Sequence, residues 1–179
     1  RAHGAPAQRA DLPCSSPAVV TVPPHQGETR PGRSPLESAA NALARALQPG
    51  SIVVLESTTY PGTTEELLVP LLREGSGLDI GTDVLVGYSP ERIDPGNATW
   101  TFVSTPKVVS GINAASLAAV DAFYRDLVDE TVPVSTPKEA ELCKLLENTF
   151  RHVNVALVNE LAMFAGELGI DVWEAIDAA

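Results

Sequence analysis

Lys144 and Asn148 have the residue types and the spacing that most clearly suit chemistry in this sequence. They lie four residues apart within a stretch, 137–168, whose apolar residues recur every three or four positions, as they do in a helix. Side chains four apart stack on one helix face, so an ammonium and a carboxamide can reach the same small volume. Both groups donate hydrogen bonds, and such donors stabilise an oxyanion. Taken alone, the pair is more typical of a solvated helix face.

A second set of candidate residues lies in the loop 56–66, which reads Glu-Ser-Thr-Thr-Tyr-Pro-Gly-Thr-Thr-Glu-Glu. The apolar run 51–55 before it predicts a strand buried on both faces, and a helix is expected after it. Doubly wound sheets bind ligands where a strand ends and a helix begins, so Ser57, Thr58 and Thr59 are candidate ligand-binding residues. In the structural alternative, the Ser and Thr side chains cap the helix and the two glutamates complement its dipole.

A third candidate segment, 89–97, reads Ser-Pro-Glu-Arg-Ile-Asp-Pro-Gly-Asn and also follows a predicted strand, 83–87. Its prolines and glycine exclude a helix interior. Glu91 can therefore serve from a loop as a general base or orient a water molecule. Read in isolation, Glu91 is expected to be an exposed acid paired with Arg92.

These candidate residues are positioned by alternating strands and helices, which predict the fold class α/β with a mainly parallel sheet. The predicted strands are 18–22, 51–55, 83–87, 107–111 and 131–134, and the predicted helices are 34–47, 64–74, 114–128 and 137–168, with a new helix from about residue 171.

The helix predicted over 137–168 is far longer than the ~11–12 residues of a typical globular helix. A helix of this length connects two domains or packs against its own copy in a dimer. The pattern therefore predicts that the strands and the end of the chain belong to different structural units.

Composition excludes some partners. The chain has 179 residues, 44% of them hydrophobic, which is enough for one domain with a core. Its formal net charge of -11 argues against a nucleic-acid partner, because phosphate binding needs clustered Lys and Arg. No apolar run reaches the ~20 residues that cross a bilayer, and the first residues resemble no secretion signal. We therefore expect a cytoplasmic protein with no nucleic-acid or membrane partner.

The cysteines and histidines predict no disulfide framework and no metal site. Cys14 and Cys143 lie far apart, which fits a reducing compartment, and Cys143 is expected to pack as a small apolar group. His3, His25 and His152 lack the close partners of a metal site.

The segments 56–64, 88–97 and 144–160, in this order and spacing, resemble the nucleotide-sugar 6-dehydrogenases, and the resemblance covers about 36–179. It implies NAD-dependent oxidation of the C6 alcohol of a UDP-sugar to a carboxylate. In this family two hydride transfers proceed through a cysteine thioester that is then hydrolysed. The implied fold is the C-terminal part of a Rossmann-like doubly wound parallel sheet, followed by a long connecting or dimerisation helix. The implied partner is a second copy of the chain.

The resemblance also implies roles for the candidate residues. Lys144 and Asn148 would stabilise oxyanions at C6, Thr58 would help to hold the water, and Glu91 would be the base in thioester hydrolysis. The implied cofactor contacts are Ser57, Thr58 and Thr59, and the implied substrate contacts are Glu91, Arg92, Ile93, Lys144 and Asn148. The motif Pro-Glu-Arg-Ile-Asp-Pro-Gly, residues 90–96, resembles that of the family branch acting on N-acetylated UDP-sugars.

Other features depart from the family pattern. The chain shows neither the Gly-rich turn that approaches the cofactor pyrophosphate nor the Gly-rich segment with the nucleophilic cysteine. We therefore expect an internal fragment, inactive alone. Its divisions would be 1–33, poorly ordered or degenerate; 34–136, a partial NAD-binding domain; and 137–179, the long central helix and the start of an all-helical dimerisation domain.

Two alternatives stay open at this point. The first is a 3-hydroxyacid dehydrogenase, because that class also places Lys and Asn four residues apart on a helix after its dinucleotide-binding domain. The loop 89–97 argues against it. The second is a non-catalytic module that dimerises through the long helix.

Overall fold

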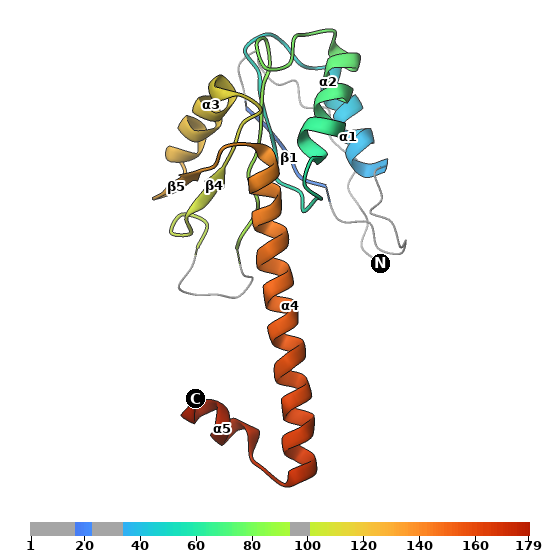
Figure 1. The fold of residues 1–179 in the computed structure, drawn as a ribbon. Coiled ribbons are helices and arrows are strands. Elements are labelled where there is room, and N and C mark those ends of the chain that lie inside the picture. Colours follow the sequence, from blue (N-terminus) through green and yellow to red (C-terminus); the bar gives the residue numbers. More distant parts are fainter. Residues whose placement is uncertain (1–16, 23–33, 94–100) are drawn as a thin grey trace, which may run out of the picture.

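The computed structural model describes residues 17–22, 34–93 and 101–179. Strands and helices alternate along the chain, so the predicted α/β class is confirmed (Figure 1). In chain order the elements are β1 (Ala18–Val20), α1 (Ser34–Ala44), β2 (Ile52–Leu55), the π-helical turn η1 (Thr64–Leu68), α2 (Val69–Ser76), β3 (Leu85–Tyr88), β4 (Lys107–Val109), α3 (Ala114–Arg125), β5 (Thr131–Pro133), α4 (Pro137–Leu168) and α5 (Val172–Ala178).

The strands pair in parallel, as predicted, within two sheets. β1, β2 and β3 pair in parallel in that order, and β4 pairs in parallel with β5. Just after β4, the Ser110 amide donates to the Tyr88 carbonyl at 3.1 Å. The Ile112 amide donates to the Val86 carbonyl at 3.0 Å. Residue 110 bonds to residue 88 and residue 112 to residue 86, so the segment after β4 runs antiparallel to β3.

Gly87 allows this junction to close. A Cβ atom at residue 87 would lie 2.1 Å from the Ser110 carbonyl oxygen and 2.9 Å from the Val120 side chain. Only glycine leaves room for the two backbones to approach so closely.

The core lies on both faces of the sheet. Val53 and Leu55 point to the face covered by α1 and α2, whereas Val54 points to the face covered by α3 (Figure 1). All three side chains are fully buried. Successive residues of a strand point to opposite faces, so a continuous apolar run is what a strand covered on both sides requires.

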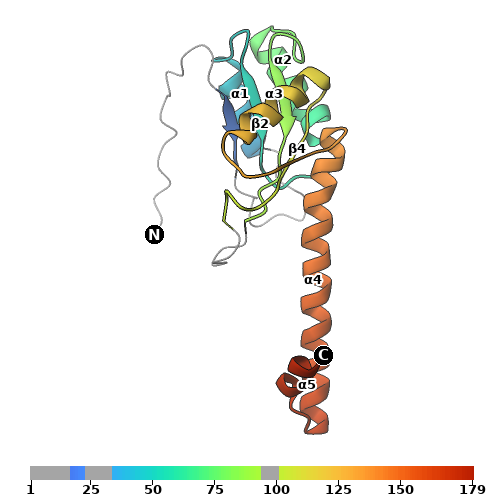
Figure 2. The same ribbon diagram turned by 90° about the vertical axis from the view of Figure 1, so that its left-hand side faces the viewer.

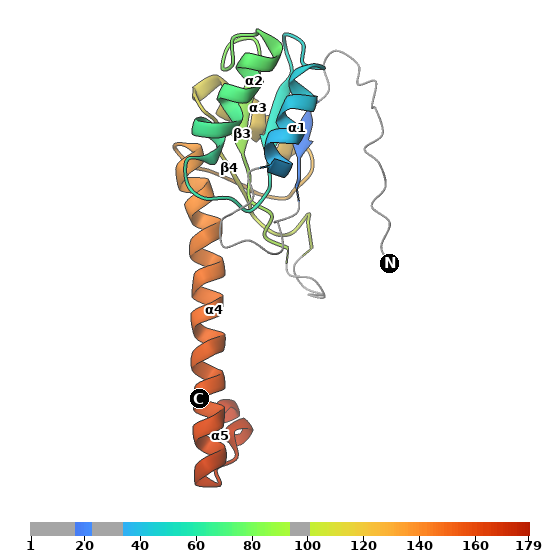
Figure 3. The same ribbon diagram turned by 90° about the vertical axis from the view of Figure 1, so that its right-hand side faces the viewer.

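The helix α4 leaves this domain and projects far beyond it, with α5 beside its distal end (Figures 2 and 3). Its bounds are those predicted. The Thr136 hydroxyl accepts from the Lys138 amide at the start, and Gly169, with a φ of +70°, ends the helix in the left-handed conformation. One side of the first two turns, with Pro137, Ala140 and Glu141, is buried against the domain, whereas residues 149–161 are exposed. No helix among the described residues has the length and apolarity to cross a membrane.

Some element bounds differ from the predictions. The helix expected over 64–74 is the π-helical turn η1 followed by α2, which continues to Ser76. Pro70 lies at the start of α2, and a proline lacks the amide that an α-helical turn would need there. The other predicted elements end or begin within a few residues of their expected positions, as is usual for helix and strand ends. Of the segment 1–33, only 17–22 lies within the described residues. The prediction that this segment is poorly ordered therefore concerns residues outside the described ones.

Candidate functional site

Two loops leave the parallel sheet side by side. The carbonyl of Leu55, the last residue of β2, accepts from the Ser89 amide at 3.0 Å. The hydroxyl of the buried Tyr88 donates to the Ser57 carbonyl at 3.1 Å. On the other side of β2, the Val22 amide donates to the Ser57 hydroxyl oxygen at 2.7 Å. The carboxyl ends of the three parallel strands therefore meet around Ser57.

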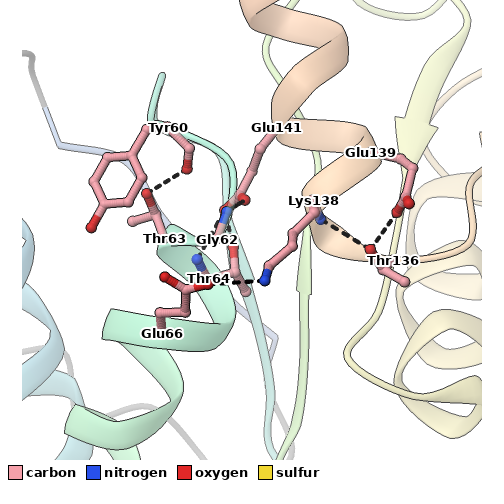
Figure 4. Close-up of polar contacts among 9 residues, drawn as sticks. All are labelled: Tyr60, Gly62, Thr63, Thr64, Glu66, Thr136, Lys138, Glu139 and Glu141. Atoms are coloured by element: carbon pink, nitrogen blue, oxygen red, sulfur yellow. Dashed lines mark hydrogen bonds and ion pairs between the residues drawn. The ribbon is translucent and has the colours of Figure 1, made fainter.

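The loop after β2 is attached to α4 by the carboxylate of Glu141 (Figure 4). This side chain has no exposed surface. One carboxylate oxygen accepts from the Gly62 amide at 2.5 Å, and the other accepts from the Thr64 amide at 2.9 Å and the Thr64 hydroxyl at 2.7 Å. The charge lies where η1 begins, and free amides and the helix dipole favour an anion there. Burial raises the pKa of Glu141, and the hydrogen bonds from Thr64 and Gly62 oppose that rise.

Sequence reasoning missed Glu141 and expected a different cap. Thr63 occupies the N-cap position of η1 but makes no capping bond through its side chain, and its hydroxyl donates to the Tyr60 carbonyl at 2.6 Å. The structural alternative, in which Ser and Thr side chains cap this helix, therefore does not hold at the N-cap position. The capping group comes from a residue 77 positions after Thr64, a distance at which local sequence patterns carry no signal.

The loop after β3 contacts two other elements. The Ile93 amide donates to one carboxylate oxygen of Glu91 at 2.7 Å, and the Lys107 ammonium lies 3.7 Å from the other. A guanidinium nitrogen of Arg92 lies 3.4 Å from a Glu147 carboxylate oxygen on α4. The expected pairing of Glu91 with Arg92 is therefore wrong, because the two side chains turn towards different elements. The rest of this motif, 94–97, lies outside the described residues.

Lys144 is half-buried on α4 between the two attachments, and Asn148, also half-buried, directly follows the second. Glu141, three residues before Lys144, bonds to the first loop, and Glu147, three residues after it, pairs with the second. Asn148 also lines an open hollow of about 370 Å³ together with His152. The structure therefore brings α4 and both loops to one edge of the sheet.

The loop after β2 offers polar groups that fit a cofactor. Thr58 is exposed, and the hydroxyl of Thr59 is buried near Tyr88 but makes no hydrogen bond of good geometry within the described residues. A buried hydroxyl of this kind favours a partner that completes its hydrogen bonding. These positions suit the polar groups of a nicotinamide cofactor at the carboxyl end of a parallel strand.

Cys143 packs against the hydrophobic core, as expected for a small apolar residue. Within 17–22, 34–93 and 101–179, no three His, Cys, Asp or Glu side chains are arranged to hold a metal ion.

This site and fold have a known counterpart. Residues 15–128 match the NAD binding domain of the UDP-glucose/GDP-mannose dehydrogenase family, and residues 138–179 match its central domain. The chain therefore belongs to this family, and NAD is its cofactor. The first match begins at residue 15 and so includes part of the segment expected to fit the family poorly. Family membership removes the 3-hydroxyacid dehydrogenase alternative.

Individual relatives agree with this assignment. The UDP-N-acetyl-D-glucosamine 6-dehydrogenase of Pseudomonas aeruginosa is 42% identical over 94% of this chain and 40% of its own length. The UDP-N-acetyl-D-mannosamine dehydrogenase of Pyrococcus horikoshii is 36% identical over 94% of this chain and 40% of its own length. A solved structure of a Pyrococcus horikoshii UDP-D-ManNAc dehydrogenase matches 91% of this chain and 39% of its own, with a TM-score of 0.82 and 35% identity. The chain thus spans about 40% of the length of these curated relatives.

Proposed function

We propose that the protein oxidises the C6 alcohol of an N-acetylated UDP-sugar to a carboxylate, with NAD as the hydride acceptor. Each sugar would consume two NAD⁺ and one water and yield two NADH. One observation carries the proposal: α4 contacts the loops after β2 and β3 within one turn of Lys144, through Glu141 and Glu147. This arrangement supports a single site built from oxyanion donors, a carboxylate and the cofactor loop.

Each candidate residue has a role in this proposal. Lys144 and Asn148 donate hydrogen bonds to the C6 oxygen when negative charge develops on it. Glu91 takes a proton from the attacking water, and its half-exposed carboxylate can reach solvent. Thr58, which is exposed at the end of β2, helps to hold that water.

The proposed cofactor contacts are Ser57, Thr58 and Thr59. NAD, when bound, supplies the oxidising equivalent for both steps. The hydroxyl of Ser57 is already fixed by the Val22 amide, so this residue orients the loop. The Thr58 side chain is exposed, and the Thr59 hydroxyl makes no hydrogen bond of good geometry within the described residues. The backbone at Arg92 and Ile93 is proposed to line the sugar-nucleotide site, since the Glu147 pair places this loop against α4.

The N-acetylated substrate is supported by the relatives, whose names include UDP-N-acetyl-D-glucosamine 6-dehydrogenase and UDP-N-acetyl-D-mannosamine dehydrogenase. The thioester step needs a cysteine other than Cys143, which packs against the core. We therefore propose that activity belongs to the complete protein, meaning this chain together with the flanking segments that its relatives contain. The chain alone would have little turnover. The cytoplasmic location stays a prediction.

The substrate proposal can be tested by following NADH absorbance with the complete protein and a panel of UDP-sugars. We expect two NADH per molecule of UDP-N-acetylglucosamine or UDP-N-acetylmannosamine, and a much lower kcat/KM with UDP-glucose. A preference for UDP-glucose would contradict the assignment to the N-acetylated branch. An absence of NADH with every UDP-sugar would contradict the proposed reaction.

We also propose that α4 joins two copies of the chain. Large apolar side chains lie exposed along it, among them Phe150 at 69%, Leu157 at 55% and Leu161 at 53% exposure. A row of this size on one helix is a surface that a protein partner covers. The three residues share one helix stripe, which suits a second copy of α4 packed against it.

Charges placed in this stripe are expected to separate the copies. The variant Leu157→Asp/Leu161→Asp should convert a dimer or larger oligomer of the complete protein to a smaller species in sedimentation velocity. The control Asn159→Asp adds a charge on the opposite side of the same helix and should leave the assembly intact. An unchanged sedimentation coefficient for the double variant would exclude this interface.

A further inference from the structure

We infer that Lys107, at the start of β4, is a positioning residue that holds the carboxylate of Glu91 for its reaction with water. This inference rests on the proposed function, in which Glu91 is the base. No feature of the sequence pointed to Lys107, which is the first residue of a short apolar strand and was expected only to form part of it.

The Lys107 ammonium is buried and has three oxygen atoms around it. Its side chain is 5% exposed. The ammonium nitrogen lies 2.9 Å from a Glu56 carboxylate oxygen, 3.3 Å from the Pro90 carbonyl oxygen and 3.7 Å from a Glu91 carboxylate oxygen. An ammonium has three N–H groups. The Glu56 and Pro90 oxygens accept from two of them, and the Glu91 oxygen lies within ion-pair distance but not within hydrogen-bond distance. Two of the three oxygens belong to the loop that carries the proposed base.

Glu56 is the counter-charge that keeps this lysine buried and charged. Its carboxylate is only 13% exposed and also accepts from the Tyr124 hydroxyl at 2.5 Å. Burial and this bond to Glu56 raise the pKa of Tyr124, so its phenol stays a donor. The ammonium also lies 5.1 Å from the Tyr124 ring centre, within the range of a cation–π contact. The Lys107–Glu56 pair is therefore complete without Glu91.

The carboxylate of Glu91 has a neighbouring donor or charge at each oxygen. The Ile93 amide donates to one oxygen, within the same loop, and Lys107 faces the other from β4. Of these two contacts, only the bond from the Ile93 amide would remain if the ammonium were removed. The Glu91 carboxylate could then rotate, because Ile93 lies in the same loop. A general base acts only from a defined position near the proton that it removes. Lys107 is itself held in the core by Glu56, and it therefore provides a fixed positive charge that orients the Glu91 carboxylate.

Charge-neutral substitution separates this role from support of the fold. Lys107→Met alone leaves the buried Glu56 carboxylate unpaired and is expected to destabilise the protein. The double variant Lys107→Met/Glu56→Gln removes both charges, so the complete protein should unfold near its original temperature. Glu91 would still have lost its partner. The control Lys138→Met/Glu66→Gln removes a pair with the same 2.9 Å separation from an exposed position.

We expect the double variant to lower kcat by about 10- to 100-fold with KM nearly unchanged, since a small misplacement of a reacting group costs up to about 100-fold. Glu91 is proposed to act in hydrolysis, so the covalent sugar adduct on the protein should accumulate and be detected by intact mass spectrometry during turnover. The control should show the original kcat and no extra adduct. Lys107→Arg keeps the charge and should give an intermediate kcat.

Other results would contradict the positioning role of Lys107 or the function on which it rests. An unchanged kcat in Lys107→Met/Glu56→Gln, or a lower kcat without more adduct, would overturn the positioning role. If the double variant does not fold, Lys107→Arg decides: the original kcat and adduct level in that variant would also overturn it. If the unsubstituted protein forms neither NADH nor adduct, the proposed function fails, and not the role of Lys107 within it.

Discussion

Replacing Lys144 by methionine is expected to lower kcat of the complete protein by about 100- to 1000-fold, the usual loss for one preorganised oxyanion donor. Methionine keeps the length and apolar body of the side chain but removes the ammonium. Lys144 is half-buried on α4, and the hydrogen bonds that join α4 to the described part of the domain come from other side chains, among them Glu141 and Glu147. KM for the UDP-sugar should therefore change far less than kcat. Steady-state NADH formation measures both constants.

Lys138→Met is the matched control for this variant. Lys138 lies on the same helix and loses the same charge, but its ammonium pairs with Glu66 on the exposed surface. Exposed pairs of this kind contribute little, because water and salt screen the two charges. We expect kcat of this control to stay within a factor of about two. Equal losses in the two variants would indicate a general charge effect and would contradict a role of Lys144 at the reacting oxygen.

Glu141→Ala is expected to loosen the attachment of α4 to the cofactor loop. The substitution leaves the Gly62 and Thr64 amides without their acceptor at a fully buried position. Each buried donor left unpaired costs about 1–3 kcal/mol, so a loss of several kcal/mol in the free energy of unfolding follows. Hydrogen exchange of these two amides should quicken strongly. We also expect kcat to fall, because Lys144 lies one turn further along α4.

Glu139→Ala provides the comparison within the same helix turn. Its carboxylate is exposed and bonds to the Thr136 hydroxyl at the helix start. Loss of this exposed local contact is expected to lower the stability only slightly and to leave the exchange of the Gly62 and Thr64 amides unchanged. Slow exchange of those amides in Glu141→Ala would show that the carboxylate does not hold the loop.

The elements that carry the site could largely be predicted from local patterns. The apolar run at 51–55 indicated a strand covered on both faces, and Val53 and Val54 indeed point into different halves of the core. The three- and four-residue spacing over 137–168 gave α4 with its observed ends. Such patterns work because burial on a strand or helix face repeats with the geometry of the element itself.

The attachments between the elements could not be predicted in the same way. Glu141 looked like one more acid on an amphipathic helix, yet it is the cap of a helix far away in sequence. Lys107 looked like a charged strand end, yet it is buried because Glu56, 51 residues earlier, neutralises it. Both contacts depend on how the chain returns to the same edge of the sheet. Residue type and spacing indicate a possible partner for a charge but do not select it.

The central claim is that α4 and the two loops form one site around the sugar C6 atom. A crystal structure of the complete protein with NAD and a UDP-N-acetylated sugar tests it most directly. The Lys144 ammonium and the Asn148 amide nitrogen should lie within hydrogen-bond distance, about 3 Å, of the C6 oxygen, with Glu91 and Thr58 around the same carbon. A sugar bound with C6 away from α4, out of reach of both donors, would contradict the account.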